Sequence, residues 1–256
     1  MSLETDVASL VTQTTKLIDY FNGRKASIDS AVASAIAAVP DTTRTWWVDP
    51  VTGNDSNDGK TSTTAFKSLN KAMAATPNAG QCNVNLMNDY TIEANIPLTV
   101  NYLVVYGIYA VSSGVTPKIK FKYQVSTDAA GTPSTQLSSF IFYSQAANIE
   151  LRSVDMDLPS PVGMSPQPVT TRICSAFKTN AGSLLPPVIG VTLQSVKVNK
   201  AADFIGALVG QASSAVIFQA VNCTFPSDMA GKYINTVAAA TDLKILTNVM
   251  TNLGTL

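Results

Sequence analysis

The sequence contains no histidine, and this absence removes the commonest forms of nucleophilic catalysis. Its 256 residues include only three cysteines, Cys82, Cys174 and Cys223, and no two of them form a CxxC motif. Serine–histidine and cysteine–histidine catalysis are therefore excluded, as is a zinc site of mixed histidine and cysteine ligands. Carboxylates, tyrosine, lysine and arginine remain for any chemistry. We expect all three cysteines to be reduced and buried.

Net charge is absent as well. The chain has 17 basic and 17 acidic residues, and its formal net charge is zero. We therefore expect neither nucleic acid nor an anionic membrane as a partner. No apolar run is long enough for a membrane span or a secretion signal, which predicts a protein folded in a reducing cytoplasm. Hydrophobic residues make up 46% of the chain and can supply a substantial core.

The first 40 residues predict a self-associating helix. Small or apolar residues recur at alternating steps of three and four, which is the heptad of a coiled coil, and Pro40 should end the helix. The charged exception is Arg24, which should reach solvent or a carboxylate such as Asp19 or Asp29. The alternative is one amphipathic helix folded onto the body, and the heptad does not count subunits. The heptad residues are Leu3, Val7, Leu10, Thr14, Leu17, Phe21, Ile28, Ala31, Ala35 and Ala38.

Residues 41–80 predict a strand, a turn-rich loop and a short helix. The sequence TWWV is typical of a strand, and residues 49–59 are dense in Asp, Asn, Ser and Gly, which favour turns. Thr63 or Thr64 is the expected N-cap of a helix whose apolar face includes Ala65, Ala72 and Met73. An EF-hand read from Asn54 fails because Ala65 replaces the bidentate glutamate, so we expect neither metal nor cofactor. We expect a cap on the following domain formed by Trp46, Trp47, Phe66 and Leu69.

Residues 81–256 contain a repeat. The segments NIELRSVDM, GVTLQSVKV, AVIFQAVNC and DLKILTNVM superpose without gaps, and they begin at Asn148, Gly190, Ala215 and Asp242. Apolar and polar residues alternate in each, as in strands with one buried face. The alternation breaks at a small residue that permits a corner. These predicted corners are Ser153, Ser195, Ala220 and Thr247.

Shorter apolar stretches accompany the repeat. One precedes each unit, and earlier units are plausible at VNLMNDYTI and YLVVYGIY. Strands that recur in this way predict a solenoid of stacked coils, with an antiparallel jelly roll or sandwich as the alternative. The chain stops at TNLGTL without a recognisable terminal cap. The preceding stretches begin at Phe140, Ser175, Phe204 and Tyr233.

Two segments carry a resemblance to known families. WWVDPVTGNDSNDGKTSTTAFKSLNKAM resembles the entry motif of right-handed parallel β-helix proteins of the pectate-lyase-like superfamily. LIDYFNGRKASIDSAVASAIAAVPD resembles the N-terminal stalk of bacteriophage tail fibres and tailspikes. The resemblance implies a mainly β protein with a trimeric coiled-coil stalk over residues 1–40, an entry region over 41–80 and a right-handed parallel β-helix over 81–256.

The same resemblance implies a function. It implies a homotrimeric structural component of a phage virion, joined through its N-terminus to tail or baseplate proteins and assembled in the cytoplasm of the host bacterium. Such a protein attaches the virion to the host surface, where it would meet a cell-surface glycan, or carries a separate receptor-binding protein. The uncapped end favours this carrier role. The alternative is a tailspike that depolymerises capsule or lipopolysaccharide.

A depolymerase would need a pair of carboxylates about 5–10 Å apart. Glu150, Asp155 and Asp157 are the candidates, all expected to point outward with Arg152 beside them. Outward polar residues are equally typical of any solvated strand, so we assign no catalytic residue and expect a structural or receptor-binding fibre rather than an enzyme. Tyrosines that could stack on sugars are expected to serve packing instead. These are Tyr102, Tyr106, Tyr109 and Tyr123.

Overall fold

The computed structural model describes residues 2–38, 42–107, 114–128, 130–143, 147–169, 171–179 and 188–256. The chain divides into two compact units, Met1–Asp41 and Thr42–Leu256. Within the described ranges, none of the helices has the length and apolar character needed to cross a membrane.

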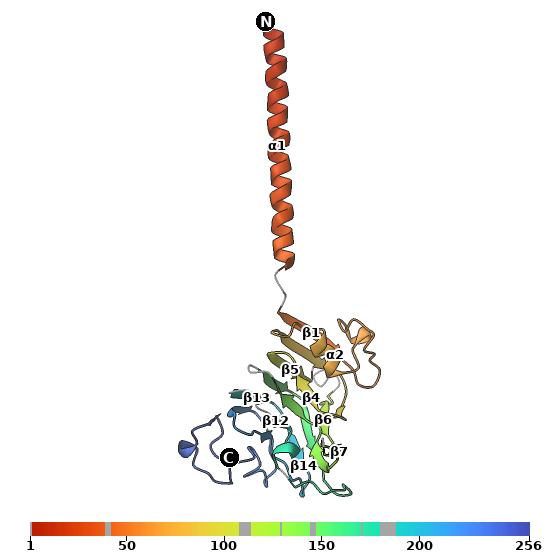
Figure 1. Cartoon of the computed structure of the whole chain (residues 1–256), viewed down its shortest axis with the longest axis vertical. Helices are drawn as coiled ribbons and strands as arrows, with labels where there is room; N and C mark the ends of the chain where they lie inside the picture. The colour runs from red at the N-terminus through yellow and green to blue at the C-terminus, as the bar shows by residue number, and fades with distance from the viewer. Residues whose placement is uncertain are drawn as a thin grey trace. The chain divides into compact units, whose positions relative to one another are not determined.

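The first unit is the helix α1, Leu3–Ala38 (Figure 1). Its bounds agree with the predicted heptad segment, although Pro40 lies outside the described residues. Glu4 and Asp6 occupy its first turn, where negative charge complements the helix dipole. Arg24 contacts neither Asp19 nor Asp29 in the described contacts. It donates from Nε to the Tyr20 hydroxyl at 3.1 Å and lies over the ring of that tyrosine.

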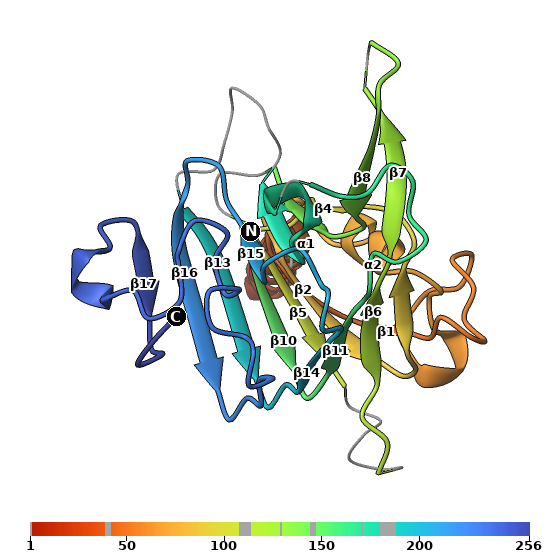
Figure 2. The same cartoon turned by 90° about the horizontal axis from the view of Figure 1, so that it is seen from below.

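The second unit is built on parallel sheets (Figure 2). Its largest sheet has seven strands, and every described pairing within that sheet is parallel. The parallel pairing excludes the antiparallel jelly roll or sandwich. In spatial order the strands are β1 (Thr43–Val48), β2 (Gln81–Leu86), β5 (Tyr102–Tyr106), β10 (Asn148–Arg152), β13 (Val188–Gln194), β16 (Ala215–Val221) and β17 (Val249–Thr251).

Two further parallel sheets have four strands each. One contains β14 (Val198–Lys200), β11 (Asp155–Leu158), β6 (Lys118–Phe121) and β3 (Tyr90–Ile92). The other contains β15 (Val209–Gly210), β12 (Phe177–Thr179), β9 (Phe140–Phe142) and β4 (Ile96–Leu98). An antiparallel hairpin of β7 (Tyr123–Thr127) and β8 (Pro133–Leu137) projects from the body (Figure 2).

Consecutive strands enter the three parallel sheets in turn. β10 lies in the seven-stranded sheet, β11 in the second and β12 in the third, and β13 then returns to the first beside β10. The corner after β10 is at Ser153, whose φ is 50°, and the corner after β13 is at Ser195, whose φ is 53°. Both corners agree with the sequence prediction.

The predicted register is correct for the first two repeats and wrong for the other two. Asn148 pairs with Gly190 as expected, but Gly190 pairs with Ile217 instead of Ala215. A shift of two residues leaves the same side chains facing inward, so alternation alone cannot detect it. The third corner accordingly lies at Asn222, with φ of 53°, and not at Ala220.

The fourth repeat is displaced further. Val216 pairs with Val249 in β17, and Leu243–Ile245 forms the 3-10 helix η3 where a strand was expected. Residues 225–256 nevertheless cover the core, because Met229, Ile234 and Leu256 are fully buried. Ile234 lies in the predicted apolar stretch that begins at Tyr233, and its parallel bridge to Val209 extends the third sheet.

The core lies between the three parallel sheets and is filled by inward-facing side chains. Phe140 and Phe177 stack at a centroid distance of 5.8 Å, and Phe121 meets Phe140 edge-on at 6.3 Å. The free thiols of Cys82 and Cys174 are buried, and burial raises the pKa of Cys82 to about 11. Cys223 is only half-buried, contrary to prediction, because it follows the corner at Asn222.

The entry region begins with β1 and ends with the helix α2, Leu69–Ala74. Its N-cap is Ser68, whose hydroxyl accepts from the backbone N–H of Lys71. The predicted caps Thr63 and Thr64 belong instead to the 3-10 helix η1, Ser62–Thr64. Asp55 accounts for the difference, because its carboxylate accepts from the backbone and hydroxyl of Ser68 and fixes the start of α2 there.

Lys178 joins three segments on the outer side of the third sheet. It lies on β12 beside buried Phe177, yet only 3% of it is exposed. Its ammonium group donates to Leu137 O at 2.6 Å, to Ile173 O in the 3-10 helix η2 (Arg172–Cys174) at 3.0 Å and to Gln136 Oε1 at 3.2 Å. These three acceptors match the three N–H donors of a lysine.

We expect Lys178→Met to lower the free energy of unfolding at pH 7 by about 2–4 kcal/mol, because three buried acceptors lose their donor. Burial lowers the pKa of Lys178 to about 8 from its ordinary value of 10.5. Between these values the unfolded chain binds more protons than the folded chain, so wild-type stability should increase with pH.

Urea denaturation at pH 7.5, 9 and 10 measures this effect as the difference between wild type and Lys178→Met. Lys122→Met is the matched control, because Lys122 is exposed and pairs with exposed Glu93. It should cost less than about 1 kcal/mol at each pH. Equal losses in both variants would contradict the role assigned to Lys178.

Candidate functional site

The three carboxylates singled out from the sequence lie on two different sheets. Glu150 is in β10, whereas Asp155 and Asp157 are in β11. The corner at Ser153 separates the two strands and turns the chain from one sheet into the next. The structure therefore brings Asp155 and Asp157 together on one strand and places Glu150 elsewhere.

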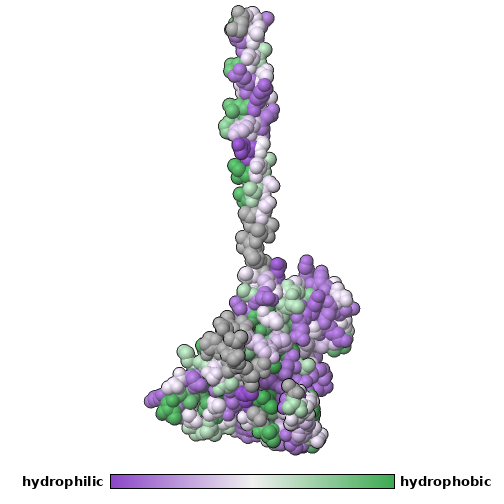
Figure 3. Space-filling model, in the orientation of Figure 1, coloured by the Kyte–Doolittle hydropathy of each residue, from purple (hydrophilic) through white to green (hydrophobic). Residues whose placement is uncertain are grey.

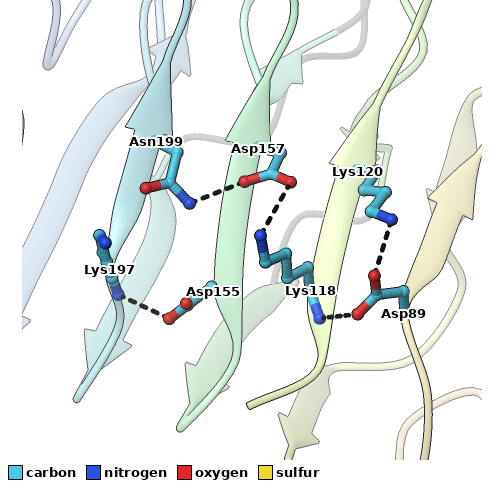
Figure 4. Close-up of polar contacts among 7 residues, drawn as sticks. All are labelled: Asp89, Lys118, Lys120, Asp155, Asp157, Lys197 and Asn199. Carbon is cyan, nitrogen blue, oxygen red and sulfur yellow. Dashed lines mark hydrogen bonds and ion pairs between the residues drawn. The ribbon is translucent and has the colours of Figure 1, made fainter. Parts of the chain in front are cut away.

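Asp155 and Asp157 belong to a row of polar contacts that crosses the second sheet (Figure 4). Asp157 accepts from Asn199 Nδ2 at 2.7 Å and pairs with Lys118 Nζ at 3.7 Å. Asp155 accepts from the backbone N–H of Lys197 at 3.2 Å. These contacts tie β11 to its neighbours β14 and β6.

The row continues at Asp89. Its carboxylate accepts from the backbone of Lys118 at 3.0 Å and pairs with Lys120 Nζ at 2.7 Å (Figure 4). The hydrogen bond with Asp89 raises the pKa of Lys120. Neither Asp155 nor Asp157 lines the grooves bordered by Arg152, by Asp55 or by Met250. Their arrangement on an open sheet face serves strand pairing better than a reaction at a glycosidic bond.

Glu150 points outward from its strand, between inward-facing Ile149 and Leu151, but it is not exposed to solvent. Its outward direction agrees with the prediction, but only 4% of the residue is accessible. The Tyr102 hydroxyl and Arg152 Nε cover it, each at 2.5 Å from a different carboxylate oxygen. Tyr102 comes from the neighbouring strand β5, in a contact that the sequence pattern does not show.

These contacts shift the pKa values of the cluster. Burial alone would raise the pKa of Glu150, but the hydrogen bonds from Arg152 and Tyr102 outweigh it and lower that pKa. Burial and the neighbouring carboxylate together raise the pKa of Tyr102 to about 12. Glu150 is therefore a buried carboxylate held in its ionised form, which makes it unsuitable as a general acid at neutral pH.

A groove of about 410 Å³ lies beside this cluster, on the outer face of the seven-stranded sheet. Asn85, Tyr106, Arg152 and Gln194 occupy one register row across β2, β5, β10 and β13. Arg152 supplies the only charge among the described residues that line the groove. The lining also includes Thr45, Asn83, Val84, Val104, Ser153 and Ser195.

Sequence reasoning missed this groove because its residues come from separate strands. A partial signal was present, since Arg152 and Gln194 hold the same place in the first two superposed segments. Tyr106 lines the groove, and the Tyr102 hydroxyl donates a hydrogen bond to Glu150. Tyr123 is half-buried against the core, and Tyr109 lies outside the described residues.

The predicted cap residues surround the entry loop. Trp46 is buried, packs on Phe66 at a centroid distance of 5.4 Å and donates from Nε1 to the Thr76 hydroxyl at 2.9 Å. Leu69 is fully buried beside them, whereas Trp47 is half-buried. Three of the four residues thus form one packed cluster with the first strand.

The aspartates of the entry loop stabilise turns. Asp49 accepts from the backbone of Val51, the Thr52 hydroxyl and Asn88 Nδ2, and these bonds lower its pKa although burial opposes them. Asp58 similarly accepts from the Thr64 hydroxyl. In the described ranges, no group of three or more His, Cys, Asp or Glu side chains is arranged to hold a metal ion.

Comparison with protein-family models and with curated proteins finds no match for this chain.

We expect Glu150→Gln to lower the free energy of unfolding at pH 7 by about 1–2 kcal/mol, because the amide loses the charged contact with Arg152. The folded-state pKa of Glu150 lies below its ordinary value of 4.5. The contribution of the Glu150 carboxylate to the free energy of unfolding is thus complete above pH 4.5. It is lost as the pH falls through the folded-state pKa. Urea denaturation at pH 7, 5 and 3.5 should show the difference between wild type and variant shrinking.

Asp157→Asn is the matched control for this acid-to-amide change. Asp157 has a side chain that is 33% exposed and pairs with a 40% exposed Lys118, so its replacement should cost less than about 1 kcal/mol. A loss in Asp157→Asn as large as that in Glu150→Gln would argue against the special status of the buried carboxylate.

Proposed function

We propose that this chain is a structural subunit of a bacteriophage tail, a homotrimeric fibre or tailspike held together through its N-terminal helix. The observation that carries the proposal is an exposed apolar stripe along α1 from Leu3 to Val32 (Figure 3). A long helix with an exposed apolar stripe is unfavourable alone in water and gains stability by packing on other helices.

The stripe contains the predicted heptad residues Leu3, Val7, Leu10, Leu17, Phe21 and Ile28, and it extends beyond them. Exposures are 80% for Leu3, 65% for Leu10 and 60% for both Phe21 and Ile28. Val11, Ile18 and Val32, each one residue after a heptad core position, widen the stripe on one side. A strict two-position seam suits two helices, whereas a wider stripe can contact two neighbours at once. This width favours a trimer over a dimer.

The second unit supports the same assignment. Consecutive strands enter three parallel sheets in turn, which is the chain path of a parallel β-helix. We propose a right-handed β-helix, because right-handed crossovers strongly predominate between parallel strands. A rod of stacked coils is a suitable element for a fibre that attaches to the host surface or carries a receptor-binding protein.

The depolymerase alternative has less support. Its candidate pair Asp155 and Asp157 is engaged in contacts between strands, and Glu150 is covered by Tyr102 and Arg152. We therefore favour a structural and attachment role within the virion, with tail or baseplate proteins as partners of the N-terminal end.

We expect the full chain to sediment as a trimer and the double variant Leu10→Asp with Leu17→Asp to sediment as a monomer. Each trimer of the variant would have to bury six unpaired carboxylates in the helix seam, at several kcal/mol each. Analytical ultracentrifugation at micromolar concentration measures the masses.

Thr12→Asp is the control, because Thr12 is exposed on α1 and lies outside the apolar stripe. It should remain trimeric. A monomeric wild type would contradict the stalk assignment.

Separately, mass spectrometry of purified virions from the phage that encodes the chain should detect it, and its absence from those virions would contradict the tail assignment.

A further inference from the structure

We propose that the groove on the outer face of the seven-stranded sheet binds a hydroxyl-rich small molecule through an oxyanion, either a phosphate or a carboxylate, with Arg152 as the anion-binding residue. This inference goes beyond the proposed function, because it depends on the second unit alone and not on the stalk or on a tail location.

The guanidinium group of Arg152 supplies the anion contact. Of its five N–H donors, the one on Nε binds Glu150, and the four on the terminal nitrogens have no partner among the described residues. The side chain is 48% exposed and lines the groove. Paired terminal N–H groups match the two oxygens of a carboxylate or phosphate.

Glu150 and Tyr102 position this guanidinium. The Glu150 side chain is 5% exposed, and its two oxygens are taken up by Arg152 Nε and the Tyr102 hydroxyl. A long exposed arginine would otherwise lose considerable side-chain entropy on binding, and the buried contact has already restricted it. Because Arg152 and Glu150 together are neutral, we expect hydrogen-bond geometry, and not long-range attraction, to determine affinity.

The other residues that line the groove indicate which chemical groups the rest of the ligand should carry. Asn85 and Gln194 offer amide donors and acceptors, and Thr45 adds a hydroxyl, whereas the Asn83 amide contacts Gln81 and Thr45. The described part of the lining holds no charged residue besides Arg152, so one anionic group is matched by several uncharged hydrogen-bonding positions. Tyr106 adds an aromatic surface suited to the face of a ring. The volume of about 410 Å³ lies within the range typical of small-molecule sites.

Isothermal titration calorimetry on the full chain tests the proposal with four probes. Glucose 1-phosphate carries a phosphate on a polyhydroxylated ring, and glucuronate carries a carboxylate on such a ring. Inorganic phosphate is the anion without the ring, and glucose is the ring without an anion. We expect one of the two sugar anions to bind at least roughly tenfold more tightly than glucose and than inorganic phosphate. Which of the two binds identifies the oxyanion.

Two kinds of variant distinguish the parts of the site. Arg152→Lys keeps the charge beside Glu150 but loses the fork, so binding of the sugar anion should weaken at least roughly tenfold. Gln194→Ala should weaken the sugar anion and leave inorganic phosphate unchanged. Lys120→Gln, which removes a cation from a different sheet, should leave all four affinities unchanged.

Replacing Arg152 alone would leave the charge of buried Glu150 without its cationic partner. Both residues must therefore be replaced together. The double variant Glu150→Gln with Arg152→Gln removes both charges, and it should fold with wild-type circular dichroism and lose sugar-anion binding. The proposal is overturned if neither sugar anion binds the wild-type chain, if the folded double variant binds as tightly as wild type, or if Lys120→Gln loses as much affinity as Arg152→Lys.

Discussion

The second unit depends on parallel strands that pair in register with the strand one circuit later. Every inward residue must meet an equivalent inward residue of the next strand, as Phe140 meets Phe177 and Ile149 meets Val191. The chain must also turn at the same place each time, and it does so at Ser153, Ser195 and Asn222, all with φ near 50°. These corners decide which side chains reach the outer faces.

The outer faces are not simply solvated. Lys178 and Glu150 both point away from the core, yet each is almost completely buried. Segments from β8 and η2 cover Lys178, whereas the side chains of Tyr102 and Arg152, from the same sheet, cover Glu150. Hydrogen bonds match the charged form of each: Lys178 donates to three carbonyl oxygens, and Glu150 accepts from two donors. In the second sheet the aspartates remain accessible, and their contacts join neighbouring strands at modest energetic gain.

The two units provide different kinds of surface. The helix α1 presents an apolar stripe that is suited to packing against other helices, whereas the groove around Arg152 presents amides, hydroxyls and one guanidinium. Rigid strands position the groove residues, so little rearrangement is needed on binding. An attachment protein that combines assembly through one unit with recognition through the other is consistent with this division.

The helix over Leu3–Ala38, the β-rich body and the corners at Ser153 and Ser195 could be predicted from the sequence, because period and small residues at breaks are local properties. The register of later strands, the burial of Glu150 and the groove could not. Alternation repeats every two residues, so it cannot distinguish Ala215 from Ile217 as the partner of Gly190. Tyr102, Arg152 and Gln194 become neighbours only when separate strands pair, and that pairing was decided by the packing of the whole core.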